Sequence, residues 1–265
     1  MFSTIRRDLV WMQALFLFFL IPFYHQAQTY ANDGQVLSQS VKKIFVEAEN
    51  KKDFSEQFVQ LNSLSTQDKQ SLLRVWESPA YPWKWRWLSV MYMAEYMMPS
   101  AEQKIVQGLQ DPLFLIRLAS IKALAVQDNL EKYQEQLIQC LKDDSLVVRK
   151  AAINALSIQP NQQVLQAVEK AMFDDKNRLQ NQQDLMGILQ SMLEIIVRYN
   201  DRQSIHTLAK LIKRSNIESE FKIQVCNALK SLVQNNSLKL EQTIKEQSDC
   251  AYQWQRWYQQ HQSSI

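Results

Sequence analysis

The amino-acid sequence predicts an all-α fold of the α-solenoid type, in which antiparallel helix pairs stack on one another. The block at 109–124 recurs without a gap at 141–156, 32 positions further along the chain. A helical unit that recurs at a spacing of about 20–50 residues is the signature of a solenoid. Glycine occurs only 3 times and proline 6 times in 265 residues, so little in the composition would interrupt helices.

The two copies agree at the positions that stacked helices need. Alanines let the helices approach closely, and leucine and isoleucine fill the remaining space between them. Each helix pair buries one stripe internally and needs a neighbouring pair to cover the other. The coincident residues are Leu109/Leu141, Asp111/Asp143, Arg117/Arg149, Ala119/Ala151, Ile121/Ile153, Ala123/Ala155 and Leu124/Leu156.

The N-terminal segment, 1–31, has the layout of a secretory signal. Two consecutive arginines precede an apolar run at 9–24, and the small residues Thr29 and Ala31 suit a cleavage point. An uncleaved membrane anchor is the open alternative, because the apolar run approaches the roughly 20 residues that a spanning helix needs. The sequence thus predicts export, either into the periplasm or anchored in the inner membrane by residues 9–24.

The rest of the chain, 32–265, is predicted to form a single α-solenoid domain, since no linker interrupts the series of apolar residues at helical spacing. Asp53 and Ser65 are expected to cap helices, and Pro82 and Pro99 to begin and end one. The expected helices are 35–48, 54–61, 66–76, 82–98, 101–109, 113–126, 131–141, 145–158, 162–173, 185–199, 201–214, 219–233 and 238–261.

Aspartate and arginine recur at fixed places in these helix pairs. We expect Asp111 and Asp143 to be N-caps of the second helix of a pair. Arg117 and Arg149 follow six positions later, where their guanidinium groups could bond the aspartate or the loop carbonyls of an adjacent repeat and so fix the stacking. Arg86 falls in the same column at an offset of 31 from Arg117.

The pattern Asp-Pro-x-x-x-Ile-Arg-x-Ala-x-x-x-Ala-Leu at 111–124 resembles the HEAT-repeat family, in the variety also found in phycobilisome lyases. Repeats are clear over 101–158 and degenerate over 66–99 and 161–234, and the aromatic helix at 249–261 is similar to the capping helix of exported bacterial members. The resemblance implies that second helices line a concave surface that holds protein partners. Polar positions expected on this surface are Lys122, Lys150, Asn154 and Gln190.

The tryptophan-rich segment at 81–98 is the densest aromatic and sulfur cluster of the chain. On a helix, Trp83 and Trp87 share one face and Trp85 another. Packing is the usual fate of such residues, but two wide apolar faces exceed what a peripheral helix needs. The group Trp83, Trp85, Arg86 and Trp87 is therefore also a second candidate surface for a partner.

Residue types that perform catalysis or bind metals are scarce. Outside the N-terminal segment the only histidines are His206 and His261, and no His-Glu dipeptide of the kind used by HEAT-repeat hydroxylases occurs. Nucleophile elbows, P-loops and dinucleotide motifs are missing. A net charge of +3 from 30 basic and 27 acidic residues does not suggest a nucleic-acid partner. We expect no catalytic residue, no metal site and no cofactor.

Three cysteines are present, and their odd number excludes complete pairing within a monomer. Cys140 lies more than two repeats from the others, which is too far for a bridge. Cys226 and Cys250 belong to adjacent elements, so an oxidising compartment would allow them to form a disulfide. Buried free thiols are the alternative.

Together these features predict a non-catalytic, exported scaffold that mediates protein–protein interaction in the periplasm or at the outer face of the inner membrane. Its partners are proteins of unknown identity, and it would meet the membrane only through an uncleaved N-terminal segment. The alternatives are an enzyme accessory protein resembling a bilin lyase and a structural envelope protein. Export argues against the lyase, because such lyases act in the cytosol.

Overall fold

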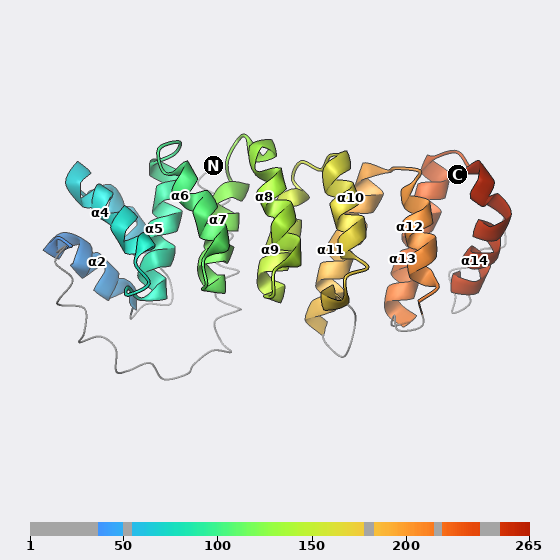
Figure 1. Ribbon diagram of the computed structural model, residues 1–265, viewed down its shortest axis with the longest axis horizontal. Helices are drawn as coiled ribbons and strands as arrows, with labels where there is room; N and C mark the ends of the chain where they lie inside the picture. The colour runs from blue at the N-terminus through green and yellow to red at the C-terminus, as the bar shows by residue number, and fades with distance from the viewer. Residues whose placement is uncertain (1–36, 50–54, 178–182, 215–218, 239–249) are drawn as a thin grey trace. The chain divides into compact units, whose positions relative to one another are not determined.

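The computed structural model describes residues 37–49, 55–177, 183–214, 219–238 and 250–265, and all regular structure in these ranges is helical (Figure 1). The all-α solenoid class predicted from the sequence is confirmed. By its contacts the chain forms two compact units, Met1–Leu124 and Ala125–Ile265. The single domain over 32–265 stays a prediction, and the predicted signal or anchor at 1–31 lies outside the described residues.

The first unit begins with helices that follow the sequence pattern closely. Ser65 caps its helix as predicted, because its hydroxyl accepts a hydrogen bond from the backbone N–H of Asp68 at 3.1 Å. Pro82 directly precedes the tryptophan-rich helix, which ends at Tyr96 rather than at 98. The helices are α2 (Gln39–Glu49), α3 (Ser55–Asn62), α4 (Thr66–Glu77), α5 (Trp83–Tyr96), α6 (Glu102–Gln107) and α7 (Phe114–Ala125).

Helix α5 is central to the first unit, where it contacts α2, α3, α4 and α6. The ring of Phe45 in α2 stacks on Trp85 with centroids 5.0 Å apart, and Tyr92 is fully buried. The two apolar faces of α5 are therefore both covered by other helices. The core cluster consists of Leu37, Val41, Ile44, Phe45, Ala48, Leu61, Leu64, Leu72, Val75, Leu88 and Tyr92.

The second unit contains two layers of helices. Second helices α9, α11 and α13 are neighbours in one layer, and first helices α8 and α10 are neighbours in the other. The bounds are α8 (Gln134–Gln139), α9 (Leu146–Leu156), α10 (Gln162–Ala171), α11 (Gln183–Tyr199), α12 (Ser204–Ile212), α13 (Ser219–Asn235) and α14 (Cys250–His261).

The first helices of the clear repeats are shorter than predicted, because each ends in a 3-10 turn. After α6 the turn Gly108–Gln110 closes with a bond from the N–H of Asp111 to the carbonyl of Gly108, at 3.2 Å. After α8 the turn Cys140–Lys142 closes in the same way. Glycine is required at 108, since a Cβ there would collide with the hydroxyl of Ser120 in α7.

The aromatic helix α14 packs against α12 and α13. Trp254 and Trp257 are buried, and the hydroxyl of Tyr258 lies 2.6 Å from Nδ1 of His206 in α12. The predicted helix 238–261 is described only from Cys250, because 239–249 lie outside the described residues. In the described part of the chain no helix is both long and apolar enough to cross a membrane.

Candidate functional site

The repeated aspartates close the turns between helices rather than capping a helix. Ser145 occupies the N-cap of α9, two residues after Asp143, and Asp111 lies three residues before α7 begins. The expectation that Asp111 and Asp143 are N-caps is therefore wrong. Their carboxylates accept from a backbone N–H two residues later, as in an Asx turn. These bonds join Asp111 to Leu113 at 2.9 Å, Asp143 to Ser145 at 2.7 Å, Asp174 to Lys176 at 2.9 Å and Asp201 to Gln203 at 2.9 Å.

The repeated arginines satisfy carbonyl groups of the same turns. Nη1 of Arg117 donates to the carbonyls of Asp111 and Pro112, at 2.8 and 3.1 Å. Nη1 of Arg149 donates to the carbonyls of Asp143 and Asp144, at 2.8 and 3.0 Å. The carboxylates and guanidinium groups, which were candidates for a charged site, thus bond to backbone groups of the same turns.

Arg149 also bridges to the next helix pair. Its Nε donates to Oδ1 of Asn177 at 2.9 Å, and its Nη2 donates to the carbonyl of Lys176 at 3.0 Å. Asn177 is buried and donates in turn to the carbonyl of Ala171 at 3.0 Å. The bond to the carbonyl of Lys176 is a contact with a loop carbonyl of an adjacent repeat, which the sequence leads us to expect. The amide of Asn177 is an acceptor that the sequence did not indicate.

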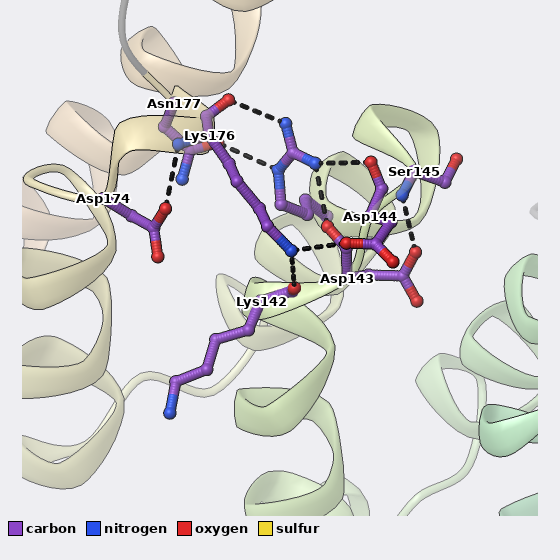
Figure 2. A network of polar contacts seen from close by, with 8 residues as sticks. Lys142, Asp143, Asp144, Ser145, Asp174, Lys176 and Asn177 are labelled. Atoms are coloured by element: carbon purple, nitrogen blue, oxygen red, sulfur yellow. Dashed lines mark hydrogen bonds and ion pairs between the residues drawn. The ribbon is translucent and has the colours of Figure 1, made fainter.

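Charged side chains surround this contact between Arg149 and the turn at 174–177, which we call the second joint. Figure 2 shows Lys176 reaching toward Lys142 and Asp144, whose carbonyl and carboxylate it contacts. Burial lowers the pKa of the Arg149 guanidinium, and the nearby carboxylates of Asp143, Asp174 and Asp144 oppose that shift. The joint is therefore a buried cation that is held by carbonyl groups and by surrounding negative charge.

Arg86 makes the equivalent contact in the first unit, which we call the first joint. Its Nε donates to the carbonyl of Trp76 at 3.0 Å, and its Nη1 and Nη2 bond the two carboxylate oxygens of Asp111. The side chains of Arg86 and Asp111 are 6% and 10% exposed. Arg86 therefore belongs to the stacking column with Arg117 and Arg149, and its place in a partner-binding group is corrected.

The tryptophan-rich helix is part of the core. Trp87 is buried, and Trp85 is half-buried between Phe45 and Tyr81, with Tyr81 stacked at 5.9 Å. Trp83 is half-buried, with the ammonium of Lys84 6.0 Å from its ring. The expectation of a partner surface at Trp87 is wrong, because neighbouring helices of the first unit cover both faces of α5.

The predicted second-helix positions divide between the two units. Lys122 is half-buried on α7 in the first unit, whereas Lys150 and Asn154 are exposed on α9 and Gln190 is exposed on α11 in the second. Helices α9 and α11 are neighbours, so the structure places the last three on adjoining helices. Sequence reasoning missed Gly187, where a Cβ would lie 3.1 Å from Nζ of Lys150. A lone glycine within a helical pattern is the signal that could have found it.

A disulfide joins Cys226 of α13 to Cys250 of α14, with Cα atoms 6.2 Å apart. Both cysteines are buried, and Cys140 is a buried free thiol. In the parts of the chain that the structure describes, no group of three or more His, Cys, Asp or Glu side chains is arranged to hold a metal ion.

Comparison with known proteins places the repeats in a family. Residues 102–183 match the family model described as HEAT repeats, which includes both copies of the block and the turn that holds Asn177. No curated protein matches the chain significantly. The match runs beyond the clear repeats at 101–158 into the degenerate part that follows. Residues 102–183 of the chain are therefore HEAT repeats.

Proposed function

We propose that this chain is a non-catalytic, exported scaffold that binds other proteins in the periplasm or at the outer face of the inner membrane. The match to HEAT repeats carries the proposal, because such repeats typically mediate protein–protein interaction. Stacked helix pairs present extended surfaces of side chains that the fold itself does not need. Lys150, Asn154 and Gln190 are exposed side chains of this kind.

The use of buried polar groups supports a role without catalysis. Arg86, Arg149 and Asn177 are the most prominent buried polar side chains of the repeat joints, and each is satisfied by bonds within its own unit. Catalytic sites more often hold titratable groups in a cleft with perturbed pKa values. Here the buried charge stabilises the stacking of repeats.

Two features support export. The N-terminal segment has the basic, apolar and small-residue regions of a secretory signal. The buried pair Cys226–Cys250 forms a disulfide, and disulfides persist in oxidising compartments such as the periplasm.

Affinity purification after mild crosslinking tests the scaffold proposal. We expect the wild type to enrich one or a few proteins, and a variant substituted at Lys150, Asn154 and Gln190 to lose them. The matched control carries substitutions at exposed first-helix positions, Gln166 and Lys170 of α10, and should keep the partners. If no protein is enriched over the second-helix variant, the scaffold proposal loses its main support.

N-terminal sequencing and thiol counting test export. A first residue of Asn32 would indicate cleavage and release, and Met1 would indicate an anchor. Alkylation of the denatured protein, purified under conditions that trap thiols, should modify Cys140 alone. Met1 together with three modified cysteines would contradict export.

A further inference from the structure

The aromatic helix α14 covers the last helix pair of the second unit. It packs against α12 and α13, and its Trp254 and Trp257 are buried. Its opposite side carries exposed polar side chains, among them Arg256 and Gln259. A stack of repeats needs such a terminal element, because the last helix pair otherwise leaves an apolar stripe in water.

The disulfide lies at the start of this helix. Cys250 is the first residue of α14, and it is joined to Cys226 of α13. Cys226 shares a face of α13 with Leu229 and Val233, because residues three and seven positions further on return to the same side of a helix. Leu229 and Val233 are also buried. The disulfide thus indicates that α14 covers this apolar face of α13.

Noncovalent contacts attach the second half of α14. The hydroxyl of Tyr258 lies 2.6 Å from Nδ1 of His206 in α12, and the ammonium of Lys213 lies 5.5 Å from the Tyr258 ring. Trp254 meets Trp257 edge to face, but its indole N–H is buried and makes no hydrogen bond within the described part of the chain. This unsatisfied donor offsets part of the favourable burial of the two indole rings.

Helix α14 is too short to persist without its neighbours. It contains 12 residues, and isolated helices shorter than about 12–15 residues are marginal in water. Detachment therefore unfolds the segment. When the sulfurs are joined, the detached chain still holds two positions together that are 24 residues apart, so it gains less conformational freedom. The disulfide should therefore favour the docked helix.

We propose that the Cys226–Cys250 pair is a redox latch for α14, which stays docked when the sulfurs are joined and detaches frequently when they are thiols. The latch closes by oxidation. Each thiol gives up one hydrogen and a sulfur–sulfur bond forms, while a disulfide oxidant such as oxidised glutathione takes up two electrons and two protons and becomes two thiols. The C-terminal end of the second unit is then open in a reducing compartment and closed in an oxidising one.

Hydrogen exchange of the purified full-length protein, measured by mass spectrometry, tests the latch. One sample keeps the disulfide, and the other is treated with a phosphine reductant until all 3 cysteines are counted as free thiols. We expect the amides of 250–261 to exchange on the order of 100-fold faster after reduction, the effect of opening a loop of this length. Helix α9 has no part in the pair and should exchange equally in both samples.

Two variants separate the pair from the reagent. Cys226→Ala combined with Cys250→Ala should exchange in α14 as fast as the reduced protein and should not respond to the reductant. Cys140→Ala keeps the pair and should respond as the wild type does, because Cys140 is a free thiol. Unchanged exchange of α14 after reduction would overturn the latch. Equal acceleration in α9 and α14 would also overturn it, because the disulfide would then support the whole second unit.

The latch goes beyond the proposed scaffold function and is tested separately from it. The exchange experiment needs neither a partner protein nor an oxidising compartment. A captured protein together with unchanged exchange of α14 would leave the scaffold standing and overturn the latch. Failure to capture any protein would count against the scaffold itself, whatever α14 does.

Discussion

Two arginines in the same column of the repeat, Arg86 in the first unit and Arg149 in the second, hold their repeats together with different acceptors. Arg86 forms a buried ion pair with the carboxylate of Asp111. Arg149 bonds the neutral amide of Asn177 and the carbonyl groups of Asp143, Asp144 and Lys176. The cation thus occurs at the same position in both repeats, whereas the groups that it bonds differ.

The two joints should fail in different ways. A buried carboxylate that loses its cation keeps its charge in a poorly solvated place, which is costly. Carbonyl and amide oxygens that lose a donor are neutral, and each loses less. The strength of a joint should thus depend on whether its acceptor is charged.

Arg86→Ala should cause the largest loss, because it leaves the carboxylate of Asp111 buried without its cation. We expect the free energy of unfolding to fall by about 4 kcal/mol, within the range for breaking a buried pair from one side. Urea denaturation, with hydrogen exchange of α5 to α7 as a local readout, measures it. The double variant Arg86→Ala with Asp111→Asn should be less destabilised than the sum of the two single changes. Strict additivity would show that the ion pair is not what holds this joint.

Arg149→Ala should cost less, about 3 kcal/mol, because it leaves several neutral oxygens without a donor. Hydrogen exchange of α9 and the turn at 174–177 should rise most. Arg149→Lys should recover only a small part of the loss, since one ammonium cannot reproduce the planar set of donors that contacts four acceptors. Full recovery by lysine would mean that charge alone stabilises this joint.

The repeat columns made the fold predictable, but they did not reveal the details of the turns. The recurring alanines, leucines and isoleucines predict helix pairs because their spacing directly reflects which faces are buried. Asp111 and Asp143 were misplaced as caps because an Asx turn and an N-cap use the same residue types only two positions apart. Asn177 carries no sequence signal of its own, since asparagine is common in turns and its partner Arg149 lies 28 positions away.

The candidate site was only partly predictable for a related reason. Lys150, Asn154 and Gln190 were found because exposed second-helix positions follow from helical periodicity. Trp87 and Arg86 are buried by tertiary packing that no local pattern states. Arg86, for example, bonds the carbonyl of Trp76 in α4 and the carboxylate of Asp111, 10 and 25 positions away. Gly187 matters only through its contact with a side chain of another helix.

Asn177→Asp converts the acceptor of the second joint into the type found in the first. The introduced carboxylate can pair with Arg149, but it can no longer donate to the carbonyl of Ala171 and would place two acceptors against each other. We expect a net loss of about 1.5 kcal/mol near neutral pH, the cost of an unsatisfied buried group. The loss measured by urea denaturation should shrink as the pH falls, because a protonated carboxyl regains a donor. A stabilised variant would show that the charge of the acceptor outweighs its hydrogen bonds.

Lys176→Ala should have the smallest effect, although its ammonium contacts both the carbonyl of Lys142 and the carboxylate of Asp144. Its ammonium pairs with Asp144 at the surface, where the two side chains are 45% and 93% exposed. Solvent and salt screen such pairs, so we expect a loss of about 0.5 kcal/mol that vanishes in high salt. The bond from Arg149 should persist, because it uses the backbone carbonyl of Lys176, which alanine retains. A loss as large as that of Arg149→Ala would instead show that the surface ion pair is what stabilises the second joint.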